Sequence, residues 1–402
     1  MKPVVAIVTP AFAPAEAYGG PVTAIVNRAS LLQERGCRVI VYTTDVIDPT
    51  KPRLRSNLPR HEVYSGVTVR RYHPILWVAG YWITPALIKD LMHDRISQIV
   101  AECARSFQLD AAALVSVIRR IPLIVVPHGS LYSYGSIEGG LRRWLYVFHN
   151  AFLKASFRRA RRVVATSSEE QNQFTRFGIS SSKMVVTPNF LDANQFSQLP
   201  EAAGFRERFG IAPDQKIILF LGRLNEIKGL DILIMAFIQI FQKRRDTWLV
   251  LVGPDSGYLK IIQGFLERSK CSSRIVVTGA LYGSAKIEAL AAADFLVVPS
   301  RYESFGIVVL EAFFCGKPVV ASNIGGLRDL VADRETGFLF RVGDVDQLAN
   351  LVEELLNKPE ERQRMGENAR QFALDHYSAR AVGDMVMSIY SPLDRDWKNG
   401  ET

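Results

Sequence analysis

The sequence contains no long apolar run: nowhere in its 402 residues do about 18–20 apolar residues, the length that spans a bilayer as a helix, follow one another without interruption. Its first apolar run, Val4–Val8, stops at Thr9-Pro10 and carries no signal-peptide cleavage pattern. The four cysteines, Cys37, Cys103, Cys271 and Cys315, are too widely spaced for a metal-ligand motif or a disulfide framework. These absences argue against a membrane-spanning or disulfide-rich protein and predict a reduced, cytoplasmic one.

Low-complexity tracts are also absent, and a hydrophobic content of 48% is that of a globular protein. The length fits two domains of about 150–200 residues each. Acidic residues are scarce in the first half, because residues 1–200 hold 24 Lys and Arg against 13 Asp and Glu, a net charge of +11. Residues 201–402 hold 25 against 27, a net charge of −2. The overall charge of +9 is therefore confined to the N-terminal half of the chain.

Short apolar runs rich in Val and Ile alternate with helix-length amphipathic segments along most of the chain. The predicted strands are Val4–Val8, Arg38–Tyr42, Val67–Tyr72, Ala112–Val117, Leu123–Val126, Val163–Thr166, Met184–Thr187, Ile217–Leu221, Trp248–Val252, Ile275–Thr278, Phe295–Val298, Val319–Ala321 and Phe338–Phe340. Strands that are apolar on both faces and alternate with helices form parallel sheets covered by helices on each side. The pattern predicts an α/β protein with two Rossmann-like, doubly wound domains.

The stretch from Phe190 to Pro213 is rich in turn-forming and polar residues and separates the two halves. We expect an N-terminal domain over residues 1–200 and a second domain over residues 201–376. Residues 377–402, which begin with a helical segment to about Tyr390, are expected to return to the N-terminal domain. In open parallel sheets, ligands bind beyond the carboxyl ends of the strands. The loops that follow the strands are therefore where function is expected.

Two of these loops combine glycine with a helix start or with cations. Gly19-Gly20 follows the first predicted strand and precedes a helix that opens with Pro21, so the backbone can approach a ligand at a positive helix end. After the strand Ile217–Leu221, Gly222 is followed by Arg223 and Lys228, two cations suited to a diphosphate. The alternative for both loops is an ordinary surface connection.

Two further loops lie in the second half. Pro299–Gly306 contains Glu303 and leads into an apolar helix that carries Glu311, where a carboxylate is costly unless it is bonded or reaches a ligand. The alternative for Glu311 is a structural salt bridge. The loop after the strand Val319–Ala321 holds another glycine pair, Gly325-Gly326.

The combination of these motifs resembles the family-4 glycosyltransferases. The resemblance rests on Gly222-Arg223-Leu224 with Lys228-Gly229, on Glu303 and Glu311 in Glu-Ser-Phe-Gly-Ile-Val-Val-Leu-Glu, and on the two glycine pairs, and it covers nearly the whole chain. It implies a GT-B fold, in which two Rossmann-like domains face a cleft and the final helix crosses back to the N-terminal domain. It also implies retaining transfer of a hexosyl group from a UDP- or GDP-linked sugar, without cofactor or metal.

The resemblance assigns roles to individual residues. Arg223 and Lys228 would bind the donor diphosphate and stabilise the leaving phosphate, Glu303 would contact sugar hydroxyls and Glu311 the ribose. Donor contacts are also implied for Gly19, Gly20, Gly222, Tyr282, Phe305, Gly306, Ile307, Gly325 and Gly326.

His128, in Pro127-His128-Gly129, resembles the family's His-Gly element. It either passes protons, positions a substrate or caps the local backbone. No dedicated nucleophile is evident, which favours front-face departure with the leaving phosphate deprotonating the acceptor. Asp344 with Asp346 and Asp394 with Asp396 are interpreted as a helix start and a tail, not as metal ligands.

The basic first half predicts where the acceptor binds. Residues 139–168 hold seven cations and no Asp or Glu, with five aromatic residues interleaved. This pattern over residues 141–162, and the aromatic stretch Leu76–Ile83, suit attachment to an anionic membrane surface that carries a lipid-linked or glycan acceptor. The alternative is that the aromatics pack in the core. No motif supports nucleic-acid binding.

Two other functions remain compatible with the sequence: a GT-B synthase that acts on a small soluble sugar, and a non-catalytic protein that binds nucleotide sugars. The presence of all four of Arg223, Lys228, Glu303 and Glu311 argues against the second. A dehydrogenase is disfavoured, since no Gly-x-Gly-x-x-Gly opens either half.

Overall fold

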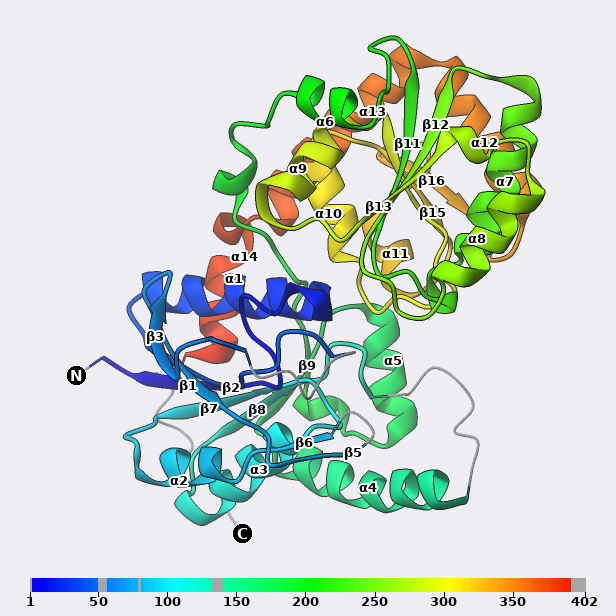
Figure 1. Ribbon diagram of the computed structural model, residues 1–402. Coiled ribbons are helices and arrows are strands. Elements are labelled where there is room, and N and C mark those ends of the chain that lie inside the picture. Colours follow the sequence, from blue (N-terminus) through cyan, green and yellow to red (C-terminus); the bar gives the residue numbers. More distant parts are fainter. Residues whose placement is uncertain (1, 50–55, 79–80, 132–139, 392–402) are drawn as a thin grey trace. The chain divides into compact units, whose positions relative to one another are not determined.

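The computed structural model describes residues 2–49, 56–78, 81–131 and 140–391 (Figure 1). The chain forms two compact units. Unit 1 comprises the chain up to Asn189 together with the residues from Val382 onward, and unit 2 comprises Phe190–Ala381. The chain thus passes from unit 1 to unit 2 near residue 190 and returns within its last described helix.

Unit 1 is built on an eight-stranded sheet. Its strands are β1 (Val4–Val8), β2 (Arg38–Thr44), β3 (His61–Tyr64), β4 (Val67–Tyr72), β7 (Gln98–Glu102), β8 (Leu123–Val126), β9 (Arg162–Ala165) and β10 (Met184–Val186). Their spatial order is β10-β9-β8-β7-β1-β2-β4-β3, and every neighbouring pair is parallel except β3–β4. From β1 the chain first adds strands on one side, β2 to β4, and then continues on the other side with β7 to β10. The switch point between β1 and β7 is the place where open α/β sheets bind ligands.

Helices cover both faces of this sheet. In Figure 1, α2 (Ala86–His93), α3 (Phe107–Arg119) and α4 (Gly140–Arg159) lie on one side. On the other side lie α1 (Gly20–Glu34) and α14 (Ala379–Tyr390), with α5 (Ser168–Phe177) near β9 and β10. A short hairpin, β5 (Leu76–Val78) and β6 (Tyr81–Ile83), contacts α3.

The predicted strand Ala112–Val117 is wrong, because these residues lie inside α3. Ser106 starts this helix by accepting a 3.2 Å hydrogen bond from the backbone of Leu109 through its hydroxyl. Five of its six residues are apolar, and such a run fits a buried strand as well as a helix. The strand of this region is β7, which the sequence analysis did not predict, as it also did not predict β3 or the β5–β6 hairpin.

Unit 2 has a six-stranded sheet in which all neighbouring strands are parallel. The strands are β11 (Lys216–Leu221), β12 (Thr247–Val252), β13 (Ile275–Gly279), β14 (Phe295–Val298), β15 (Val319–Ser322) and β16 (Gly337–Phe340). Their order, β13-β12-β11-β14-β15-β16, is the Rossmann order, and its switch point lies between β11 and β14.

The helices of unit 2 complete the layers. They are α6 (Ala202–Arg208), α7 (Leu230–Lys243), α8 (Leu259–Arg268), α9 (Gly283–Ala292), α10 (Ile307–Phe314), α11 (Gly325–Leu330), α12 (Val345–Asn357) and α13 (Pro359–Tyr377). Fully buried aromatic side chains, among them Phe220, Phe237 and Phe295, fill the core around the sheet. The predicted class, two Rossmann-like parallel domains, is confirmed.

The C-terminal helix returns to unit 1, as predicted. From Val382 onward α14 belongs to that unit, where Asp384 forms a 2.8 Å ion pair with Arg35, the residue that follows α1. The ring of Tyr390 lies 4.9 Å from the guanidinium carbon of Arg28, also on α1. Asp344 starts α12 by accepting a 2.9 Å hydrogen bond from the backbone of Gln347, while Asp394 and Asp396 lie outside the described residues.

Candidate active site

The switch point of unit 2 carries an ion pair between two loops. Lys228 ends the loop after β11, and Glu303 lies in the loop after β14. The Lys228 ammonium donates a hydrogen bond to Glu303 Oε2, and the two side chains are 19% and 16% exposed. The sequence-predicted cation and carboxylate are thus brought together at the carboxyl ends of adjacent central strands.

Arg301 ties these two loops to each other. Its backbone N–H donates to the carbonyl of Ile227 at 2.7 Å, and its guanidinium donates to the carbonyl of Glu226 at 2.9 Å. The guanidinium also forms two hydrogen bonds, of 2.8 and 2.6 Å, with the carboxylate of Asp231 in α7. Burial would raise the pKa of Asp231, but the hydrogen bonds and charge of Arg301 outweigh it and hold the pKa below its ordinary value. No role was predicted from the sequence for Arg301 or Asp231, although Arg301 lies in the loop Pro299–Gly306.

We expect Asp231→Asn to lower the melting temperature at pH 7 by a few degrees, because about 1 kcal/mol of charge-assisted bonding is lost. A carboxyl whose pKa is depressed on folding stabilises the fold above its unfolded pKa, and this stabilisation disappears as the pH falls through the folded value. The difference from wild type should therefore shrink below about pH 4.

Thermal melts between pH 7 and 3 measure this difference in melting temperature. Asp246→Asn is the control, because Asp246 forms a more exposed pair with Arg244 and its loss should have a smaller effect. Equal melting temperatures of wild type and Asp231→Asn at pH 7 would contradict the stabilising role of the Arg301–Asp231 ion pair.

The loop that holds Glu303 is packed closely against α11. The backbone N–H of Gly326 donates to the carbonyl of Glu303 at 3.2 Å. A Cβ atom on Gly326 would lie 2.4 Å from the Cα of Phe305, so only glycine fits this approach. Gly306 has a φ of 101° and precedes α10, and no side chain caps that helix. The backbone N–H of Ile307 therefore lies at a helix start that can receive an anion.

Glu311 lies within α10 and is only 5% exposed. Its Oε1 accepts a 2.5 Å hydrogen bond from the ammonium of Lys286 in α9, and the Lys286 side chain is 24% exposed. The salt bridge that the sequence analysis kept as an alternative is thus present. Oε2 of Glu311 bonds no residue in the described part of the chain. Lys286 was missed because nothing in the sequence of α9 relates it to α10.

The other predicted donor residues of unit 2 follow inner strands and an edge strand of the sheet. Arg223 follows Gly222 after β11, is exposed, and bonds no residue among those described. Gly325 is the first residue of α11, after β15. Tyr282 precedes α9 and follows β13, the edge strand, so β12 separates its strand from β11. The structure therefore groups Arg223 with the Lys228 loop and places Tyr282 at the edge of the sheet.

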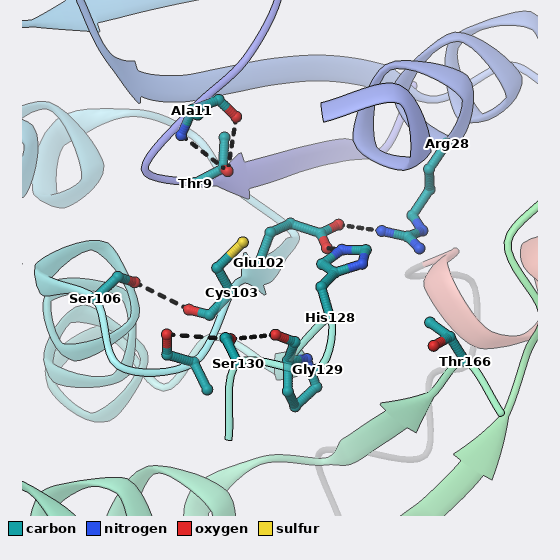
Figure 2. A network of polar contacts seen from close by, with 12 residues as sticks. Thr9, Ala11, Arg28, Glu102, Cys103, Ser106, His128, Gly129, Ser130 and Thr166 are labelled. Atoms are coloured by element: carbon teal, nitrogen blue, oxygen red, sulfur yellow. Dashed lines mark hydrogen bonds and ion pairs between the residues drawn. The ribbon is translucent and has the colours of Figure 1, made fainter. Parts of the chain in front are cut away.

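Three predicted residues belong to unit 1. Gly19, with a φ of 82°, precedes α1, and Gly20 is the first residue of that helix. His128 follows β8 in the left-handed region, with a φ of 53°. Its Nε2 lies 2.6 Å from Oε2 of Glu102, the last residue of β7. Arg28 of α1 donates to Oε1 of the same carboxylate, and Figure 2 shows Glu102 between the two.

Among the described residues, no group of three or more His, Cys, Asp or Glu is arranged to hold a metal ion. None of the described helices has both the length and the apolar character needed to cross a membrane.

Two family models match the chain, one in each unit. Residues 18–195 match the model described as Glycosyltransferase Family 4, and residues 203–372 match the model described as Glycosyl transferases group 1. Together the matches extend over most of both sheets.

Similar proteins act on sugars. Alpha-D-kanosaminyltransferase of Streptomyces kanamyceticus is 28% identical over 336 residues, covering 79% of this chain and 84% of that protein. A GDP-mannose-dependent alpha-(1-6)-phosphatidylinositol monomannoside mannosyltransferase of Mycolicibacterium smegmatis is 33% identical over 54% of this chain and 58% of its own length.

Among solved structures, Anabaena HepE in complex with UDP-glucose matches with a TM-score of 0.77 and 22% identity, over 97% of this chain and 100% of that one. At this identity the likeness establishes the fold alone. With its two Rossmann-like units and the two family matches in chain order, the protein belongs to the GT-B glycosyltransferases of the family-4 type.

Proposed function

We propose that this protein is a retaining hexosyltransferase that moves a sugar from a UDP- or GDP-linked donor to a hydroxyl of a lipid-linked or polysaccharide precursor. The observation that carries the proposal is the Lys228–Glu303 pair at the switch point of unit 2, beside the uncapped start of α10. The name of the Mycolicibacterium relative specifies GDP-mannose and phosphatidylinositol monomannoside, which supports the donor and acceptor classes. The HepE complex with UDP-glucose also supports the donor class.

A nucleotide sugar presents a doubly charged diphosphate directly beside a sugar ring rich in hydroxyls. The paired Lys228 and Glu303 offer an ammonium for a phosphate oxygen and a carboxylate that accepts hydrogen bonds from hydroxyls. Arg223 adds the second positive charge that a diphosphate requires. The N–H of Ile307 at the start of α10 can donate to a phosphate oxygen as well.

The same cations act on the leaving group. Negative charge grows on the β-phosphate as the bond to the sugar breaks, so cations fixed at that position stabilise the transition state more than the ground state. Arg301 and Asp231 hold the Lys228 loop in place, and this rigidity is what such stabilisation requires. We propose front-face departure, in which the leaving phosphate takes the proton of the attacking hydroxyl and the anomeric configuration is retained.

We propose that Glu311 accepts hydrogen bonds from the ribose hydroxyls of the donor. Lys286 holds Oε1 of its carboxylate and leaves Oε2 as an acceptor. The Lys286 ammonium forms an ion pair with this buried carboxylate. A carboxylate oxygen accepts a stronger hydrogen bond from a hydroxyl than a neutral oxygen does.

The experiment that tests the proposal is a measurement of nucleoside diphosphate release from a panel of UDP- and GDP-hexoses. The anomeric configuration of the hexose product is determined by NMR. Release of nucleoside diphosphate together with a product of the same configuration as the donor supports retaining transfer. Inversion would overturn the mechanism, and absence of release across the panel would favour the non-catalytic alternative.

An apolar surface of unit 1 supports membrane attachment of the acceptor-binding half. On α3, the side chains of Leu114, Val117 and Ile118 are exposed at helical spacing. On α4, Phe152 is exposed and is followed by the exposed cations Arg158 and Arg159. In the hairpin, Leu76 and Trp77 are exposed. Apolar side chains flanked by cations suit the interface of an anionic membrane.

Not all of the predicted segment 141–162 contributes in this way. Phe157 and Leu153 are buried in the core of unit 1, as the alternative for this segment expected. The side chains of Arg142, Arg143, Trp144, Tyr146 and Phe148 lie outside the described part. The exposed apolar face of α3 was not part of the membrane surface predicted from the sequence, because part of this helix was predicted as a strand. We add this face to the proposed surface.

We expect Ile118→Ser to weaken binding to vesicles that contain anionic lipid severalfold without lowering the melting temperature, because Ile118 is 56% exposed. Ile261→Ser, at a 46% exposed position of α8 in unit 2, is the matched control and should bind as wild type does. Co-sedimentation at low and high salt gives the measurement. Equal recovery of wild type with neutral and anionic vesicles would remove the membrane proposal.

A further inference from the structure

Beside the predicted residue His128 lies a buried charge pair that the sequence analysis did not identify. Glu102 is fully buried at the end of β7, and the side chain of Arg28 is 3% exposed. Unpaired, either charge would be very costly at this depth. The guanidinium is further enclosed by the ring of Tyr390, which α14 brings back to unit 1. The pair is therefore a fixed part of unit 1 at its switch point.

The charge state of Glu102 follows from its partners. Burial would raise the pKa of this carboxyl, but the Arg28 charge and the hydrogen bond with His128 outweigh burial and lower it. Because Glu102 is an anion, both of its oxygens can only accept hydrogen bonds. Arg28 donates to Oε1, so the contact of 2.6 Å between Oε2 and Nε2 requires a hydrogen on Nε2 of His128.

The backbone around His128 is held by a second buried carboxylate. Oε1 of Glu170 accepts a 2.6 Å hydrogen bond from the N–H of Gly129, and Oε2 accepts from the N–H and hydroxyl of Thr166 at 2.7 and 2.8 Å. His128 itself has a left-handed backbone, a conformation that a non-glycine residue keeps only where its surroundings fix it. Ring and backbone are thus fixed by separate carboxylates.

We propose that the Arg28–Glu102 pair is a positioning device that fixes His128 as the Nε2–H tautomer and presents its Nδ1 lone pair to a hydroxyl group of the substrate. Nδ1 bonds none of the described residues, whereas Nε2 is committed to Glu102. A neutral imidazole with hydrogen on Nε2 is an acceptor at Nδ1. Glu102 and Arg28 act through His128 and are not themselves catalytic residues.

The inference rests on the proposed sugar transfer for its consequence, but the tautomer can be measured without it. Two-bond ¹H–¹⁵N correlation spectra of protein labelled at its six histidines distinguish the two tautomers. The loss of one signal in His128→Gln assigns the residue. We expect hydrogen on Nε2 in the wild type, and hydrogen on Nδ1 there would overturn the proposal without any further variant.

Glu102→Gln is the decisive substitution because it keeps the size and removes the charge. Arg28 can only donate, so the glutamine oxygen must face Arg28 and its NH₂ group must face His128. Nε2 then has to accept, and the hydrogen moves to Nδ1. We expect the tautomer to reverse and turnover to fall about 100-fold, while the stabilisation by UDP or GDP, bound in unit 2, stays unchanged.

Glu170→Gln is the matched control, since it loosens the same loop without touching the imidazole ring. It should retain the Nε2–H signal. Retention of that signal in Glu102→Gln, or reversal with unchanged turnover, would overturn the positioning role. If wild type shows the expected tautomer but transfers no sugar from any donor, the proposed function fails and the assignment of the tautomer stands.

Discussion

Replacing Lys228 with alanine is expected to lower kcat/KM for the nucleotide sugar about 100- to 1000-fold. The ammonium is the group that meets the growing charge on the leaving phosphate, and its removal also leaves Glu303 as an unpaired, largely buried anion where a diphosphate must bind. We expect a lower kcat as well as a higher KM, because the interaction is stronger in the transition state than in the ground state. Initial rates of nucleoside diphosphate release measure both constants.

Lys243→Ala is the control for this substitution. Lys243 also lies in unit 2 and also pairs with a glutamate, Glu353, but it is 62% exposed and ends α7 away from the loops after the strands. An exposed pair of this kind contributes little, so the variant should have wild-type turnover. Wild-type turnover in Lys228→Ala would refute the assignment of the diphosphate to this loop.

Gly326→Ala is expected to lower turnover about 100-fold with a smaller effect on stability. An added methyl group would press on the backbone of Ser304 and Phe305, at 2.5 and 2.4 Å, and neither position can yield as a flexible side chain would. Displacing this loop moves Glu303, and a shift of about 1 Å in a reacting group can reduce the rate 100-fold. Overpacking should also reduce the free energy of unfolding by about 1–3 kcal/mol.

Gly264→Ala provides the matched control within α8. A Cβ atom there meets nothing within 4 Å, so alanine should stabilise the protein by about 0.5–1 kcal/mol through its helix propensity. Turnover and denaturant melts of both variants are the measurements. If Gly326→Ala loses stability but keeps its rate, the contact between α11 and the Glu303 loop serves folding only.

The donor loops could be predicted from the sequence because each lies within one short segment. Lys228, Glu303 and Gly326 each lie in the segment between a predicted strand and the next helix or at the start of that helix. The order of parallel strands brings such segments to one edge of the sheet. What the sequence could not supply is the pairing across segments. Arg301 with Asp231, and Lys286 with Glu311, join a loop to a helix or two helices that only the folded chain brings together.

The network around His128 was missed for a different reason. Its central residue, Glu102, is the last residue of β7, a short strand that begins and ends with a polar residue. The apolar run at 112–117 was taken for the strand of this region. Apolar content alone cannot separate a buried helix from a buried strand. With β7 overlooked, no prediction placed a carboxylate beside His128.

The central claim is that unit 2 holds a nucleoside diphosphate on Lys228. Thermal shift with UDP and GDP tests this claim most directly, because a ligand that binds only the folded state stabilises it by about 2.7 kcal/mol at 100 times its Kd. We predict that one of the two nucleotides raises the melting temperature of the wild type by several degrees, and that Lys228→Ala abolishes most of this shift. No shift with either nucleotide, or an equal shift in Lys228→Ala, would contradict the account.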